Sequence, residues 1–157
     1  MKNPIMHSRD AVYGSEAKCF VTLNGRRMNF LHLTDFEGIT TINSQQVKIL
    51  GKVGFGNKAA GMNGKWKATA HFNQSHFRVI ADHYQKTGEM PYFEIQVTNQ
   101  DRTATVGRQT IIYKDCLITG DVILSKFQAG DQILDEEISG TFESFDMPEK
   151  FNDLEGL

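Results

Sequence analysis

A two-residue alternation in the middle of the chain restricts the fold more than any other feature. Between Lys65 and Phe72, one set of alternate residues is apolar and the other is polar: Trp66, Ala68, Ala70 and Phe72 against Lys65, Lys67, Thr69 and His71. Successive side chains of a β-strand point to opposite faces. The pattern therefore predicts a strand with one face on a core and one in water, as in antiparallel sheets.

Similar runs occur along most of the chain. Further strands are predicted at 16–24, 28–33, 36–42, 46–50, 92–98, 106–114, 116–124 and 134–144. Asn24 and Gly25 separate the first two runs, and this pair favours a tight hairpin because both residues accept a positive φ. Asp115 separates the runs 106–114 and 116–124. Strands without alternating helices favour an antiparallel sandwich or barrel.

One segment has helical periodicity. Phe77, Ile80, Ala81 and Tyr84 recur at helical spacing, and Gly88 suits a left-handed cap at the C-terminal end. Asn73 or Ser75 can cap the start. We therefore expect a mainly β fold, an antiparallel β-sandwich or barrel with one flanking α-helix at about residues 75–87.

The length of 157 residues suits a single domain spanning 1–157. Within it we expect an N-terminal arm at 1–14, an extended loop at 51–63 and an acidic C-terminal tail at 145–157. The N-terminus lacks the apolar core of a signal peptide, and no apolar run is long enough for a membrane anchor. We expect synthesis in a cytoplasm, with Cys19 and Cys116 as reduced thiols.

The segment 51–63 holds four glycines and two lysines between strand-like regions. A loop of this length inside a compact domain is usually functional or disordered. Its composition admits a phosphate cradle, a linker, or an arm that grips another molecule. A phosphate loop needs Ser or Thr after its lysine and then a helix, but Lys58 precedes Ala59 and a strand follows.

Other site chemistry is not indicated by the sequence. The five histidines and two cysteines show no ligand spacing, and no nucleophile elbow is present. We predict no catalytic residue, no metal site and no cofactor, and hence no enzyme.

The charge is unevenly distributed along the chain: residues 1–130 hold sixteen Lys/Arg and ten Asp/Glu, whereas 131–157 hold one lysine and nine Asp/Glu. A solvated acidic tail explains this, and so does head-to-tail contact between copies.

Four collinear stretches carry a family resemblance: Gly14–Lys18 with the Asn24-Gly25 turn, the loop at 51–64, the run 92–110, and Leu134–Ser139 with Phe142–Phe145. Together they resemble the tail tube protein of PBSX-type prophage elements, a family that also serves contractile phage tails and phage-tail-like bacteriocins. The resemblance implies a β-sandwich or barrel similar to the tube protein of type VI secretion systems. It also implies hexameric rings stacked into a hollow tube inside a contractile sheath.

The resemblance further implies partners. They are other copies of the chain, the tail sheath protein, the baseplate or initiator, and the tape-measure protein, with DNA passing transiently in an infectious phage. The location implied is the virion tail or a phage-tail-like particle, assembled from protein made in the bacterial host cytoplasm.

We expect subunit contacts at the 51–63 segment. Phe55 and Met62 are predicted to pack on a neighbouring subunit, and Lys52 and Lys58 to pair with carboxylates of Asp135, Glu136 and Glu137. The alternative is a small β-barrel that binds a ligand or oligonucleotide, with residues 51–63 as its lid.

Overall fold

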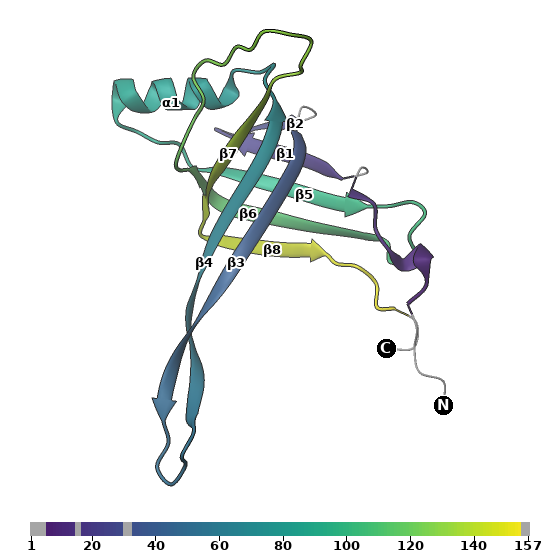
Figure 1. The fold of residues 1–157 in the computed structure, drawn as a ribbon, viewed down its shortest axis with the longest axis vertical. Helices are drawn as coiled ribbons and strands as arrows, with labels where there is room; N and C mark the ends of the chain where they lie inside the picture. Colours follow the sequence, from purple (N-terminus) through teal and green to yellow (C-terminus); the bar gives the residue numbers. More distant parts are fainter. Residues whose placement is uncertain (1–5, 15–16, 30–32, 155–157) are drawn as a thin grey trace.

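The structure, a computed structural model, describes residues 6–14, 17–29 and 33–154, and it is mainly antiparallel β-sheet with one helix (Figure 1). The strands are β1 (Lys18–Leu23), β2 (Arg26–Asn29), β3 (Leu33–Lys48), β4 (Phe55–His71), β5 (Phe93–Gln100), β6 (Arg108–Ile118), β7 (Asp135–Phe142) and β8 (Ser144–Glu149). A short 3-10 turn, η1 (Ser8–Asp10), precedes them, and α1 (His76–Thr87) lies between β4 and β5. The expected fold class is confirmed.

Two sheets pack together and share one strand. The strand order is β2-β1-β5-β6-β7-β4-β3, with β8 paired to β6, and every pairing is antiparallel. The residue Asp115 has a φ of 54°, the left-handed region, within β6. Before this bend β6 pairs with β5 and β8, and after it Leu117 and Ile118 pair with β7. The predicted break at Asp115 is thus a bend at which one strand passes between sheets.

The core between the sheets is aromatic. Trp66 lies 6.2 Å from the ring of Phe36 and 6.0 Å from that of Phe93, and Tyr113 lies 4.9 Å from Phe142. The predicted inward faces of β4 and β5 supply much of it, and Trp66 is only 3% exposed. Cys116 is fully buried and Cys19 partly buried, both thiols are free, and burial raises the pKa of each to about 12.

Two local predictions are confirmed in detail. Asn24 and Gly25 have φ values of 53° and 77°, and Leu23 pairs with Arg26 across this two-residue turn. The helix α1 ends at Gly88, which has a φ of 76° and donates its amide to the carbonyl of Tyr84. Phe77 buries the inner face of this helix against the core.

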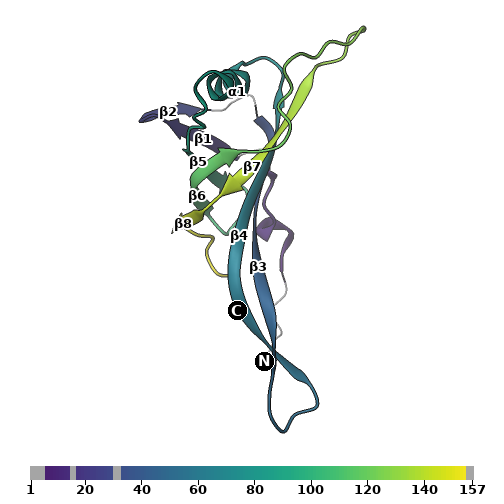
Figure 2. The ribbon, with the colours of Figure 1, turned by 90° about the vertical axis from the view of Figure 1, so that its left-hand side faces the viewer.

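The region around residues 51–63 differs from the predicted loop. β3 and β4 pair from Leu33 to Lys48, so the predicted strands 36–42 and 46–50 are one strand with an irregularity after Ile42. The chain turns at 49–54, and Phe55 already belongs to β4. The segment 51–63 resembles a loop in sequence because it contains glycines and lacks the alternation of apolar and polar residues. Most of it nevertheless forms a strand, because the hydrogen bonds that pair two strands are made by the backbone and require no apolar side chain. The long hairpin projects from the body (Figures 1 and 2).

The C-terminal region also differs from prediction. Residues 144–149 form β8 rather than an acidic tail, because their side chains find partners on β6 and in the core. Asp146 pairs with Lys114 at 2.7 Å, and Glu149 with Arg108 at 2.6 Å. Phe145 packs 6.4 Å from Phe142. Within the tail, residues 155–157 lie outside the described residues.

The N-terminal segment is fastened to the β5–β6 connection. The amide of Thr105 donates to the carbonyl of Arg9 at 3.0 Å, and that of Tyr13 donates to the Asp101 carboxylate at 2.9 Å. Asp101 also accepts from the amide and hydroxyl of Thr103. The predicted N-terminal arm (residues 1–14) is therefore held by hydrogen bonds at residues 9–13, and residues 1–5 lie outside the described part.

Close approach of the neighbouring strands β4, β7 and β6 depends on Gly140. A Cβ there would overlap the carbonyl oxygen of Leu117 and the ring of Trp66. We predict that Gly140→Ala destabilises the protein by about 2–3 kcal/mol, because the backbone oxygen cannot rotate away. Urea unfolding followed by tryptophan fluorescence measures this. Gly54→Ala is the control, since a Cβ at Gly54 meets nothing within 4 Å; equal midpoints for the two variants would contradict the prediction.

Acid should release the N-terminal segment. The hydroxyl of Thr103, and then the amides of Tyr13 and Thr103, hold the pKa of Asp101 below its ordinary value of 3.8. A lowered pKa in the folded state means that this stabilisation is complete above pH 3.8 and is lost as the pH falls below it. We expect NMR shifts of the Tyr13 and Thr103 amides to titrate together below that pH, and not at all in Asp101→Asn. Titration above it would contradict the assignment.

Candidate assembly surface

The distal half of the β3–β4 hairpin, residues 42–62 (here the arm), concentrates exposed apolar side chains. The inward-facing row of β3 and β4 runs on past Trp66 to Met62 and its cross-strand partner Ile42. No second sheet covers the row there, and both side chains are more than half exposed. Further exposed apolar residues follow toward the tip: Val47, Ile49, Leu50, Val53 and Phe55.

The tip is the extreme case. Leu50 is 96% exposed and Val53 is 104% exposed, so neither touches the body of its own chain. Apolar side chains concentrated on one projection, rather than scattered singly, mark an interaction site. Leu50 and Val53 were not among the predicted contact residues, although both lie within or beside the 51–63 segment.

The arm is also uniformly basic. No Asp or Glu occurs from Gly38 to Ala81, while Lys48, Lys52 and Lys58 lie on the arm. Lys52 lies in the turn, and Lys58 lies on β4 opposite Gln45. The predicted residues Lys52, Phe55, Lys58 and Met62 are thus brought together on one projection. A basic and apolar surface of this kind favours an acidic and apolar partner.

The predicted carboxylates lie at the other end of the same hairpin. Asp135 is paired with His71 at the end of β4, with its carboxylate 2.9 Å from the His71 ring nitrogen Nδ1, and Glu137 lies opposite Thr69. Both carboxylates are exposed. The structure therefore does not bring them near Lys52 or Lys58 within one chain.

The predicted role of Glu136 as a partner for lysines of a neighbouring subunit is corrected by the structure. Its side chain is 2% exposed, and its Oε2 atom lies 2.8 Å from the guanidinium of Arg78. Arg78 also donates to the carbonyls of Ile123 and Gln74 and lies over the ring of Phe72. Glu136 alternates inward with Ile138, so it pairs inside its own subunit and not with a neighbour. No local pattern in the sequence predicts this buried pair, because Arg78 lies on α1 and Glu136 on β7.

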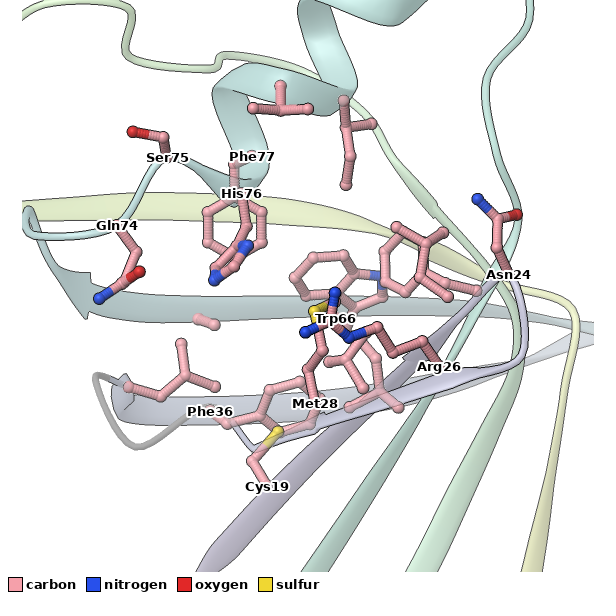
Figure 3. Close-up of a pocket in the computed structure, with 18 of the residues that line it drawn as sticks. Cys19, Asn24, Arg26, Met28, Phe36, Trp66, Gln74, Ser75, His76 and Phe77 are labelled. Carbon is pink, nitrogen blue, oxygen red and sulfur yellow. The ribbon is translucent and has the colours of Figure 1, made fainter.

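A cavity of about 590 Å³ lies between α1 and the sheets (Figure 3). Trp66, Phe77 and Phe93 line it, with Arg26 and Gln74 among its polar residues. No residue of 51–63 is among the described residues that line it, so the alternative in which this segment is the lid of a binding pocket is not supported. In the described ranges no three His, Cys, Asp or Glu side chains group as metal ligands, and no helix is long and apolar enough to cross a membrane.

The described chain is a mainly antiparallel β-structure with one helix, two edge strands and a projecting hairpin. The family model described as "Phage tail tube protein" matches residues 5–149, and the chain belongs to this family. The chain is 31% identical over 148 residues to the phage-like element PBSX protein XkdM of Bacillus subtilis (strain 168), covering 94% of this chain and 97% of that protein.

Solved structures show the same fold at low identity. A chain in the baseplate of the anti-feeding prophage superposes with a TM-score of 0.60 at 13% identity, covering 94% of this chain and 97% of that chain. A chain in the sheath/tube terminator of the PVC extracellular contractile injection system gives 0.62 at 11% identity, covering 94% and 99%. The resemblance to tail tube proteins seen in the sequence is confirmed.

The ion pair between Arg78 and Glu136 should hold α1 against the start of β7. We predict that Arg78→Met costs about 3–5 kcal/mol, because it leaves a buried carboxylate without its partner. The double variant Arg78→Met/Glu136→Met should recover most of that loss, since no charge is then buried. Chemical denaturation of the four proteins of this double-mutant cycle gives the coupling. Additive losses in the double variant would contradict the assignment.

Proposed function

We propose that this protein assembles into stacked hexameric rings that form the inner tube of a contractile phage tail or phage-tail-like particle. The observation that carries the proposal is the arm: a basic, apolar hairpin that no described part of its own chain covers. Membership of the tail tube family supports the same function.

Ring closure is supported by the sheet edges. β3 is at one end of the strand order and β2 at the other, so each has one unpaired side. An edge of sixteen residues, the length of β3, presents a row of free backbone donors and acceptors. Continuation of the sheet into neighbouring copies satisfies these groups, and a closed ring of copies has no edge left.

Contact between rings is assigned to the arm. Lys58 and Thr69 are eleven residues apart on β4, which corresponds to roughly 36 Å of strand. Lys52 and Lys58 therefore reach the carboxylates of Asp135 and Glu137 only on another copy, with Phe55 and Met62 packing beside them. Such a contact joins different surfaces of identical subunits, and it propagates instead of closing.

The remaining partners follow from this role. A sheath protein surrounds the tube, a baseplate or initiator starts it, and a tape-measure protein sets its length, while DNA passes through only in an infectious phage. The protein would then belong to the tail particle. The family and the assemblies that contain the structural relatives, which include a baseplate and a sheath/tube terminator, support these partners.

Shortening the arm tests the proposal. Ile42 faces Met62 across the hairpin, so residues 43–61 can be replaced by a two-residue Asn-Gly turn without disturbing the body. We expect the variant to keep the unfolding midpoint of the wild type but to form no tubes in negative-stain electron microscopy. Long tubes from this variant would refute the role of the arm. A second variant, Val79→Ser on the exposed face of α1, is the control and should form tubes as the wild type does.

A further inference from the structure

The end of the molecule opposite the arm carries a second set of exposed apolar side chains. Residues 119–134 (here the end loop) connect β6 to β7 and form the far end of the long axis, with the arm at the other end (Figures 1 and 2). Leu124 and Ile133 are well exposed, and Phe127 is 95% exposed. These side chains, like those of the arm tip, are left uncovered by the described residues of their own chain.

The end loop is fixed at its base. The amide of Thr119 donates to the carbonyl of Ser139 at 3.0 Å, and that of Phe72 donates to the carbonyl of Leu134 at 2.9 Å. The guanidinium of Arg78 donates to the carbonyl of Ile123 at 3.2 Å, and Val122 packs against the core. The exposed apolar residues are therefore presented from an anchored segment.

Charge at this end is opposite to that of the arm. Asp121 and Asp131 lie on the end loop, and Asp135 and Glu137 follow at the start of β7. The loop's lysine, Lys126, donates to the backbone carbonyl of Asp135 at 2.8 Å. The arm, in contrast, has three lysines and no carboxylate. Each end of the molecule thus presents apolar side chains, beside lysines on the arm and beside carboxylates at the end loop. The two surfaces are therefore complementary in charge.

We propose that the end loop is the receptor for the arm tip of a second copy of this chain. Leu50 and Val53 pack against Leu124 and Phe127, and Lys48 pairs with Asp121 and Asp131, beside the pairing of Lys52 and Lys58 with Asp135 and Glu137 proposed above. This assignment rests on the proposed stacking, and it names the surface that the arm contacts. Because the two surfaces lie at opposite ends of one long axis, repetition of the contact extends the assembly along that axis.

Cross-linking between copies tests the contact directly. Val53→Cys and Phe127→Cys proteins are mixed under oxidising conditions, and disulfide-linked dimers are measured on non-reducing gels. We expect the mixture to give at least about tenfold more dimer than a mixture of Val53→Cys with Val79→Cys, because docking raises the local thiol concentration. Equal dimer in the two mixtures would overturn the assignment.

Complementation separates this contact from the proposed function itself. The arm variant Leu50→Ser/Val53→Ser and the receptor variant Leu124→Ser/Phe127→Ser leave the sheet edges intact. Each alone should form rings but no tubes, and their mixture should form pairs of rings, since each supplies one surface that the other lacks. Tubes from either variant alone, or no pairs in the mixture, would refute the arm–end loop contact. If the wild type forms neither rings nor tubes, the proposed function fails, and the cross-linking result still decides the contact.

Discussion

The packing of Trp66 between two glycines is the contact on which the rest of the structure depends. Its cross-strand neighbours are Gly38 on β3 and Gly140 on β7. The ring of Tyr113 lies where a Cβ of Gly38 would be, and the Trp66 ring and the Leu117 carbonyl lie where a Cβ of Gly140 would be. Large rings thus fill space that the glycines leave open, which brings the two sheets together. Interiors at this density tolerate little added volume.

Much of the fold could be predicted from local patterns, because strand alternation, the Asn24-Gly25 turn and the Gly88 cap depend on neighbouring residues. The arm could not, since Gly54, Gly56 and Gly61 suit a loop and a hairpin equally, and pairing with β3 decides between them. For the same reason Lys52, Phe55, Lys58 and Met62, which we predict as contact residues, were attributed to a loop, whereas Phe55, Lys58 and Met62 lie on β4. The prediction that Glu136 contacts a neighbouring subunit was wrong for a different reason: its partner Arg78 is far away in the sequence, so no local pattern indicates the pair.

Charge in the last part of the chain has two uses that the sequence cannot separate. Glu136, Asp146 and Glu149 pair with basic residues of their own subunit. Asp131 and Glu137 are exposed on or beside the end loop. The acidic excess after residue 130 is therefore partly internal, and the part available to a neighbour is smaller than the sequence total and concentrated at one end.

The two-stranded construction of the arm has a kinetic consequence. Beyond Ile42 and Met62 the two strands of the hairpin pair with each other and with no other described strand, and an isolated hairpin is at best marginally stable in water. The free energy of ordering the arm is then drawn from the contact that it makes, as in coupled folding and binding. In the proposed assembly, a ring docks several arms at once on the ring below it, so that the later contacts form at a higher effective concentration than a contact between two lone subunits. Growth on an existing end is thereby favoured over spontaneous initiation in solution.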